Sequence, residues 1–260
     1  MTRRRVWHGN CIEKMKTFAA LLLTFPLSAL ADTANTSAPS EPVKTPEVSP
    51  WSGEVEFGLI RATGNTNSNS ANGKGKVEYN HNRWKHTATL AILNSSSNGT
   101  TTAQSNVFNG KSRYNFQERE YLFANLLYQE DHLSGYRSQV SETAGYGRRV
   151  IDQPELFLDL EAGGGARQSN PRTGPSTNEM IARGYGHLQW QVGPSSVFSQ
   201  RVIIESGSNN TQTQSITSLK SKVNGSLAMK LSYTVKHNTI VPAGSAKTET
   251  LTSATLVMDF

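Results

Sequence analysis

Histidines are the first residues to consider for chemistry, because an imidazole ring can act as a general base or as a metal ligand. Five of them follow the N-terminal region, at His81, His86, His132, His187 and His237. No two are separated by two or four residues, the spacing that brings paired metal ligands onto one face of a strand or helix. The only cysteine is Cys11, so no cysteine-based metal site is available either. The sequence predicts no bound metal and no cofactor.

His187 supplies the one catalytic alternative that deserves a test. A barrel phospholipase needs a histidine near a serine on the outer face of its wall. His187 instead alternates with Tyr185 and Gln189 on a polar face, and the sequence has no Gly-x-Ser-x-Gly elbow. A histidine in a polar network is therefore the favoured interpretation. We predict that the protein is not an enzyme and keep an outer-membrane lipid-modifying enzyme as the alternative.

Carboxylate pairs and a glycine run have simpler explanations than catalysis. Glu54 and Glu56 lie two residues apart, as do Asp159 and Glu161, so each pair shares one strand face. Lysines and arginines on neighbouring strands are expected to neutralise such pairs. The run at 163–165 lacks the lysine of a phosphate-binding loop, and it is better explained by barrel curvature or by large neighbours. No residue is assigned a catalytic or cofactor-binding role.

The elements that carry these residues are predicted to be β-strands. Beyond residue 50 apolar and polar residues alternate, as where Val55 and Phe57 alternate with Glu54 and Glu56. We count twelve such segments, with ten or fourteen as neighbouring possibilities. Short turns are predicted near 80–82, 117–119, 152–154, 193–195 and 224–225, and longer loops at 64–68, 95–102, 131–138, 169–177, 206–212 and 242–247. Such alternation of turn lengths is typical of an outer-membrane barrel with both termini on the periplasmic side.

The two faces of these strands predict an inside-out protein. The polar face carries fifteen charged residues that we expect to line a wet lumen: Lys74, Lys76, Glu78, Lys111, Arg113, Asp159, Glu161, Arg167, Arg183, Arg201, Glu205, Lys220, Lys222, Lys230 and Lys236. The other face has aromatic residues beside the short turns, expected to form a girdle at the membrane boundary: Tyr79, Trp84, Tyr114, Phe116, Tyr121, Trp190 and Phe198. Because lipid cannot satisfy an open sheet edge, the first and last strands should pair.

The N-terminal region has the order of features of a secretory signal peptide. Basic residues precede an apolar stretch that ends at Ala29-Leu30-Ala31, so residues 1–31 are expected to be removed. Either Met1 or Met15 could be the true start. Residues 32–50 contain four of the ten prolines and are predicted to form a periplasmic tether. Residues 51–260 are the predicted barrel domain.

The formal charge of +6 and pI of 9.4 suggest nucleic-acid binding, but the charge is concentrated at the N-terminus. Five of the 26 basic residues and one of the 20 acidic residues lie within 1–31, which leaves 21 basic against 19 acidic residues. The remaining chain therefore has no electrostatic footprint for a polyanion, and we predict no nucleic-acid partner.

The chain resembles the YdiY-like family of salt-induced outer-membrane proteins, whose domain has no known function. The resemblance covers 51–260 and depends on residues 64–67 after the first strand, on the glycine patterns at 145–147 and 163–165, and on a last strand ending in Phe260. Lys247-Thr248-Glu249 departs mildly from the family, which often has an aspartate there. The resemblance implies an outer-membrane location, a link to salt or osmotic stress, and recognition of Phe260 by the barrel-assembly machinery.

These observations predict a structural barrel or a narrow passive pore, in contact with outer-membrane lipid. Eleven of the fifteen predicted lumen charges are basic and four are acidic, so an open pore should weakly prefer anions. A twelve-stranded barrel lies between small barrels filled by side chains and larger porins with aqueous channels, so paired charges could also occlude the lumen. A soluble periplasmic β-barrel binding protein is a further alternative.

Overall fold

The computed structural model describes residues 49–63, 68–97, 100–131, 136–172, 174–241 and 245–260. The predicted signal peptide, and the predicted tether up to residue 48, lie outside the described residues. In the described residues no helix is long and apolar enough to cross a membrane. The barrel forms one compact unit, Val48–Phe260.

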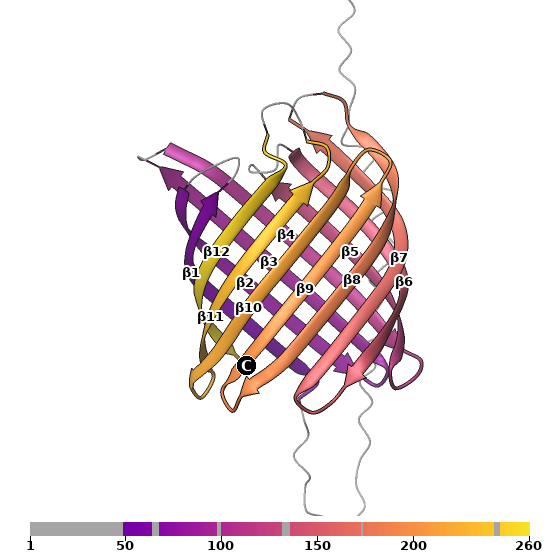
Figure 1. The fold of residues 1–260 in the computed structure, drawn as a ribbon, viewed down its shortest axis with the longest axis vertical. Coiled ribbons are helices and arrows are strands. Elements are labelled where there is room, and N and C mark those ends of the chain that lie inside the picture. The colour runs from indigo at the N-terminus through magenta and orange to yellow at the C-terminus, as the bar shows by residue number, and fades with distance from the viewer. Residues whose placement is uncertain (1–48, 64–67, 98–99, 132–135, 173, 242–244) are drawn as a thin grey trace, which may run out of the picture. The chain divides into compact units, whose positions relative to one another are not determined.

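Twelve antiparallel strands form a closed barrel, which confirms the predicted fold class (Figure 1). Each strand pairs with its neighbours in sequence, and β1 pairs with β12 to close the sheet. The strands are β1 (Trp51–Thr63), β2 (Ser68–His81), β3 (Trp84–Ser97), β4 (Thr100–Asn115), β5 (Glu120–Asp131), β6 (Tyr136–Asp152), β7 (Leu156–Pro171), β8 (Thr177–Gly193), β9 (Ser196–Gly207), β10 (Thr211–Asn224), β11 (Leu227–Asn238) and β12 (Thr248–Asp259).

The connections at the two ends of the barrel differ as predicted. Short turns follow β2, β4, β6, β8 and β10 at the lower end in Figure 1, where the C-terminus also lies. Gly225 adopts a left-handed φ of 46° in the turn after β10, a conformation that glycine takes without steric strain. We call this end the short-turn end and the opposite one the long-loop end.

Several strands extend further at the long-loop end than the sequence predicted. Residues 95–97, 136–138 and 169–171, expected in loops, belong to β3, β6 and β7. The serines and amides of β6 and β7 had indicated loops, but these side chains also pair across the ladder. Gln139 Nε2 donates to Ser169 Oγ at 2.9 Å, and Asn170 Nδ2 donates to Ser138 Oγ at 3.0 Å. Such cross-strand pairs stabilise polar strands.

The strands alternate between a buried polar face and an exposed apolar face. In β12, Thr255 and Val257 are buried whereas Leu256 and Met258 are exposed. Exposed large apolar residues occur all around the barrel: Phe57, Leu90, Ile92, Leu122, Met180, Leu219, Met229, Leu231, Leu256 and Met258. A soluble barrel would bury these side chains, so the arrangement is the one required by a hydrocarbon surrounding. This contradicts the soluble alternative.

The aromatic girdle is present at the short-turn end, with one correction. Trp84 lies 4.9 Å from Tyr114 between ring centroids, and Tyr79 lies 4.5 Å from Trp51, a member that the sequence analysis missed. Tyr121, which was predicted in the girdle, is instead fully buried on the inner face. Apolar residues occupy both faces of β5, so alternation alone could not orient it.

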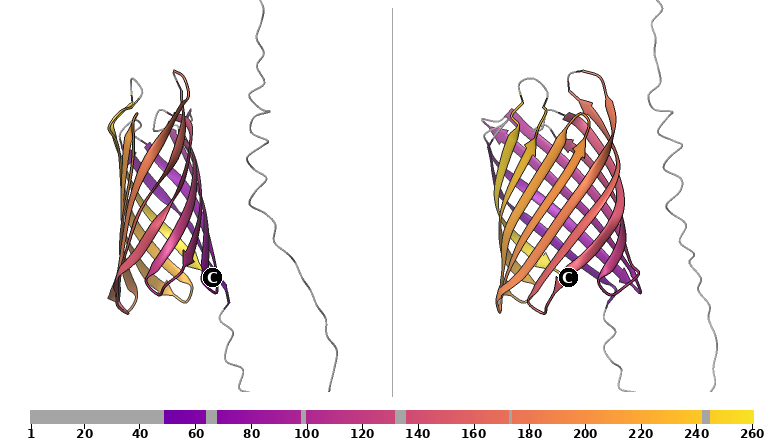
Figure 2. Two further views of the ribbon diagram at one scale, coloured as in Figure 1. Left: turned by 90° about the vertical axis from the view of Figure 1, so that its right-hand side faces the viewer. Right: turned by 45° about the vertical axis from the view of Figure 1, so that its right-hand side comes forward.

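The barrel is flattened: it is narrower in the left panel of Figure 2 than in the right panel, which is drawn at the same scale. Glycines lie on the inner face of β1 and of β6, which are at opposite sides of the flattened barrel in Figure 1. A Cβ atom on Gly145 would lie 2.2 Å from the carbonyl oxygen of Ala162, and one on Gly58 would lie 2.3 Å from that of Ala254. Only glycine permits such close backbone approach, so these residues allow the wall to turn sharply. This supports the curvature interpretation of the glycine runs.

Candidate functional site: the charged lumen

Contacts between strands that are not neighbours identify the inner face. Lys220 of β10 contacts Glu54 of β1 at 2.8 Å, and Lys230 of β11 contacts Glu56 of β1 at 2.8 Å. These strands are not adjacent in the closed sheet. Such pairs can form only through the interior, so the polar face lines a lumen.

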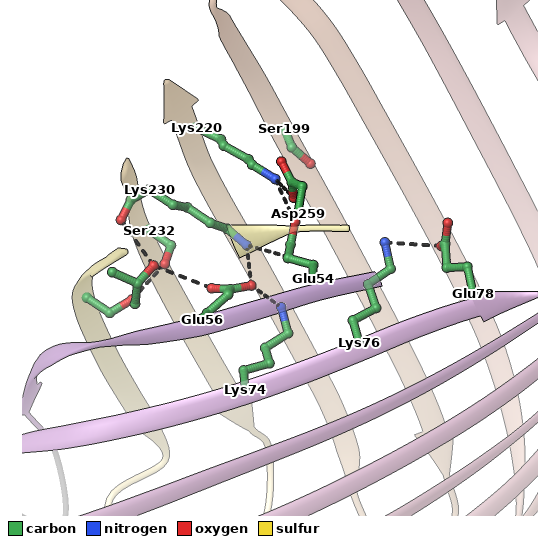
Figure 3. Close-up of polar contacts among 12 residues, drawn as sticks. Glu54, Glu56, Lys74, Lys76, Glu78, Ser199, Lys220, Lys230, Ser232 and Asp259 are labelled. Atoms are coloured by element: carbon green, nitrogen blue, oxygen red, sulfur yellow. Dashed lines mark hydrogen bonds and ion pairs between the residues drawn. The ribbon is translucent and has the colours of Figure 1, made fainter. Parts of the chain in front are cut away.

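The first group of lumen charges, which we call the β1 cluster, is shown in Figure 3: Glu54, Glu56, Lys74, Lys220, Lys230 and Asp259. Glu56 accepts hydrogen bonds from Lys74 at 2.7 Å and from Lys230 at 2.8 Å. Lys220 bridges Glu54 and Asp259, at 2.8 and 2.6 Å. Because β1 pairs with β12, the cluster lies across the seam that closes the barrel.

The second group, the β7 cluster, lies around two carboxylates on β7: Asp159 and Glu161, with Lys111, Arg113, Tyr121 and Arg149. Arg149 donates two hydrogen bonds to Asp159, at 2.7 and 3.0 Å, the fork geometry that suits a guanidinium. Glu161 accepts from Lys111 and from the hydroxyl of Tyr121. These partners come from β4, β5 and β6, so the cluster links four consecutive strands, β4 to β7, through their side chains.

The hydroxyl of Tyr121 explains why this ring faces inward. It donates to Glu161 at 2.9 Å, while the Arg113 guanidinium lies 3.5 Å from the ring centroid. A tyrosine on the outer face would lack both partners. Gly147, directly across on β6, leaves the space that the ring occupies, since a Cβ atom there would lie 2.3 Å from it. The inward position is thus specified by a polar partner and a glycine.

The third group, the long-loop cluster, is the most deeply buried: Gln139, Arg167, Ser169, Glu179, Asn210 and Gln212. The Arg167 and Glu179 side chains are 1% and 2% exposed and are joined by hydrogen bonds of 3.0 and 2.7 Å. The backbone amide of Asn209 also donates to Glu179 at 2.7 Å. These hydrogen bonds therefore hold the loop after β9 against the inner face at the long-loop end.

All fifteen predicted lumen residues lie on strands of the barrel, on the face shared with these clusters. Arg183 pairs with Glu205 at 2.8 Å, and Lys76 pairs with Glu78 at 3.1 Å. Lys222 lies near the short-turn end, whereas Lys236 is in register with Glu249 near the long-loop end. Their use as a pore lining stays a prediction.

The sequence analysis missed seven further inner-face charges: Glu54, Glu56, Lys85, Arg149, Glu179, Glu249 and Asp259. Glu54 and Glu56 had been recognised as a one-faced pair but left out of the predicted lining. Arg149 lies on β6, where alternation was weak, and Glu179 and Glu249 lie close to strand ends. The period-two spacing of Glu179 from Arg183, with Met180 and Ala182 on the opposite face, was the signal that could have found one of them.

His187 lies on the inner face, as predicted, beside Ser199 of β9. Its Nε2 is 3.1 Å from Ser199 Oγ. Asp159 is in register with His187 on the adjacent strand, but both of its oxygens accept from Arg149. The described residues therefore show a histidine–serine pair without a hydrogen-bonded carboxylate to orient it, whereas a hydrolytic triad requires that third partner.

Two shallow cavities lie at the short-turn mouth of the lumen, with volumes of about 230 and 270 Å³. Both are lined by Glu54 and Asp259; the larger one is also lined by Lys220 and Lys222. Charged side chains of both signs therefore line this mouth of the lumen. The described residues contain no group of three His, Cys, Asp or Glu side chains that could hold a metal ion.

Residues 55–260 match the family described as "Protein of unknown function, DUF481". The chain belongs to this family. A relative in it, the uncharacterized protein YdiY of Escherichia coli K12, is 26% identical over 220 residues, covering 83% of this chain and 84% of YdiY. The family membership confirms the resemblance drawn from the sequence, and it assigns no activity.

Solved structures with a similar fold include a porin and the translocator domain of an autotransporter. The NanC porin matches with a TM-score of 0.55 and 9% identity, over 78% of this chain and 98% of the porin. The translocator domain of the autotransporter NalP from Neisseria meningitidis matches with a TM-score of 0.51 and 9% identity, over 83% and 90% of the two chains. These likenesses show the fold: a DUF481 chain forms a channel-like barrel of the outer-membrane type.

Proposed function

We propose that this protein is a narrow passive pore of the bacterial outer membrane with a weak preference for anions. The observation that carries the proposal is the charge of the inner face. By strand alternation the described residues there include thirteen Lys and Arg side chains against nine carboxylates. The excess is smaller than the sequence analysis suggested, because most of the missed charges are carboxylates. It still favours anions in a confined, charged passage.

The pairing of the lumen charges accounts for the narrowness of the proposed pore. Most cations reach a carboxylate on another strand, and each such bridge occupies part of the cross-section. Ions would pass between fixed pairs and not through a wide aqueous channel. A structural role without conduction is the alternative, and it is supported by the same pairs.

The proposal includes the location and the partners. The apolar outer face and the aromatic girdle would contact outer-membrane lipid. We further propose that the barrel-assembly machinery recognises β12 and Phe260, whose backbone forms two hydrogen bonds with Gly53 of β1, at 2.8 and 3.0 Å. Replacing Phe260 with alanine should then slow membrane assembly while the refolded barrel keeps its heat-modifiable migration.

Reversal potentials in planar bilayers test the pore directly. With a tenfold KCl gradient across the bilayer, we expect small discrete conductances whose reversal potential is displaced toward the equilibrium potential of chloride. Bilayers exposed to the same detergent without protein are the control. A displacement toward the potassium potential would contradict the anion preference, and an absence of conductance in repeated reconstitutions would leave the structural role.

The enzyme alternative retains the single contact between His187 and Ser199. It predicts that refolded protein hydrolyses phospholipid and that His187→Gln abolishes turnover. The absence of turnover in the unmodified protein would exclude it. The proposed link to salt stress requires a separate comparison, in which a deletion strain should lose growth at high salt and regain it with the intact gene.

A further inference from the structure

Arg201 differs from the other arginines of the inner face, because none of the described carboxylates forms an ion pair with it. Arg113, Arg149, Arg167 and Arg183 each contact an Asp or Glu within 3.4 Å. The Nε atom of Arg201 is buried and lacks a hydrogen-bond partner among the described residues; a buried nitrogen of Arg167 and one of Arg183 do so too, but these two arginines each have a carboxylate partner. A buried guanidinium donor without an acceptor is unfavourable unless a ligand or water supplies one.

The groups that face Arg201 come from more than one side of the lumen. Arg201 lies on β9 and is in register with His187 of β8 and Ile216 of β10. Its guanidinium is also within electrostatic range of Tyr185 on β8 and of Lys74 on β2. β2 and β9 are separated by four strands on the shorter path around the sheet, so these cations face each other across the lumen.

The charge around this point is positive. Lys74 and Lys230 share one carboxylate, that of Glu56, which is thus already bonded to two lysines. On the other side, Glu205 is occupied by Arg183. The Arg201 guanidinium is therefore left with its charge uncompensated, between two groups whose carboxylates are already engaged.

We propose that Arg201, with Lys74 on the facing wall, forms a binding site for a small oxyanion inside the lumen. A planar guanidinium can donate two parallel hydrogen bonds to a carboxylate or a phosphate, while an ammonium supplies a less directional charge. Arg113, Arg149, Arg167 and Arg183 donate hydrogen bonds to carboxylates of the barrel, whereas no described carboxylate accepts one from Arg201. The ligand class is a small solute that carries a carboxylate or phosphate group. The site rests on the proposed pore and specifies which anions pass or block it.

Phosphate binding to the refolded full chain tests the site without requiring conduction. In detergent micelles at constant ionic strength, the ³¹P resonance of inorganic phosphate should broaden in a saturable way on addition of protein. Arg201→Gln should weaken this binding by at least about tenfold, the effect of losing a charge-assisted hydrogen bond. Arg201→Lys should give an intermediate loss, because it keeps the charge but not the fork geometry.

Arg148→Gln is the matched control, because it makes the same chemical change on the outer face, where the Arg148 side chain is 61% exposed. It should leave phosphate binding unchanged. Heat-modifiable migration identifies any variant that fails to fold. If Arg201→Gln fails to fold, Arg201→Lys is compared with the unmodified protein instead. Equal phosphate binding by Arg201→Gln and the unmodified protein, or no saturable binding by the unmodified protein, would overturn the proposal.

Bilayer recordings separate this proposal from that of the pore. If the unmodified protein binds phosphate through Arg201 but conducts no ions, the pore fails and the site stands. If it conducts anions and phosphate blocks the current equally in Arg201→Gln, the pore stands and the site fails. Block of the unmodified channel by millimolar phosphate, relieved in Arg201→Gln, is the result expected when both are correct.

Discussion

Gln212 on β10 donates a hydrogen bond from Nε2 to Oε1 of Gln139 on β6 at 3.1 Å, although three strands separate them in the sheet. Two amide side chains are thus enough to join these parts of the wall near the long-loop end. Gln139 also donates to Ser169, and Arg167 donates to the backbone carbonyl of Asn210 beside it. These described side chains therefore constrict this end of the lumen.

Removing that bridge should widen the passage without changing its selectivity. Gln212→Ala deletes a neutral side chain, so single-channel conductance should rise while the reversal potential stays constant. Gln200→Ala is the control, because its amide lies on the outer face and bonds Ser215 and Thr217. An unchanged conductance in Gln212→Ala would show that the long-loop end does not limit ion flow.

The pair of Arg167 and Glu179 should contribute strongly to stability. Removing one partner of a buried ion pair typically costs about 3–5 kcal/mol, because the other charge stays buried. We therefore expect Arg167→Met and Glu179→Leu each to lower the free energy of unfolding by about that amount, and the double variant to lose less than the sum. Urea unfolding in lipid vesicles, followed by tryptophan fluorescence, measures the cycle.

An exposed ion pair provides the contrast. Arg119 and Asp152 are 3.6 Å apart, with side chains 55% and 41% exposed. Arg119→Met should change stability by less than about 1 kcal/mol, as for other solvent-screened pairs. Additive losses in the Arg167 and Glu179 cycle would show that the two side chains do not stabilise each other in the folded barrel.

Gly147 should tolerate no side chain, because the Tyr121 ring occupies the space. A Cβ atom at Gly147 would lie 2.3 Å from that ring, so Gly147→Val must displace it from Glu161 and Arg113. We expect a loss of about 1–3 kcal/mol, typical of overpacking, and slower refolding into vesicles. Gly184→Val is the control, since no atom lies within 4 Å of the corresponding Cβ position. Equal effects of the two substitutions would argue against the Tyr121 contact.

The orientation of a strand could be predicted from the sequence only where apolar and polar residues alternate regularly along it. β12 alternates cleanly, and its orientation follows from Leu256 and Met258 on one face alone. In β5 the residues Tyr121 and Phe123 are as apolar as their outward neighbours, so only the three-dimensional partners decide the orientation. The closed sheet and strand number were predictable because most strands alternate regularly and because short and long connections alternate between the twelve strands.

The site was less predictable than the fold. Alternation indicates that Lys230 points inward, but it cannot show that Glu56 is its partner, since the two are 174 residues apart and belong to strands that are not adjacent. That pairing depends on the tilt and closure of the barrel. The lack of a carboxylate partner at Arg201 is likewise invisible in the sequence, because nearby carboxylates exist and are simply bonded to other cations.

The account depends most on which face of each strand meets lipid, and β11 allows that to be measured residue by residue. Single cysteines at 227–238, introduced into the mature chain and labelled with nitroxides in lipid vesicles, report accessibility to oxygen, which enriches in lipid, and to a polar nickel chelate. Positions such as Leu231 and Tyr233 should be relaxed by oxygen, and positions such as Ser232 and Thr234 should not. The opposite phase, or an absence of alternation along β11, would contradict a barrel with apolar residues in lipid and charges in its lumen.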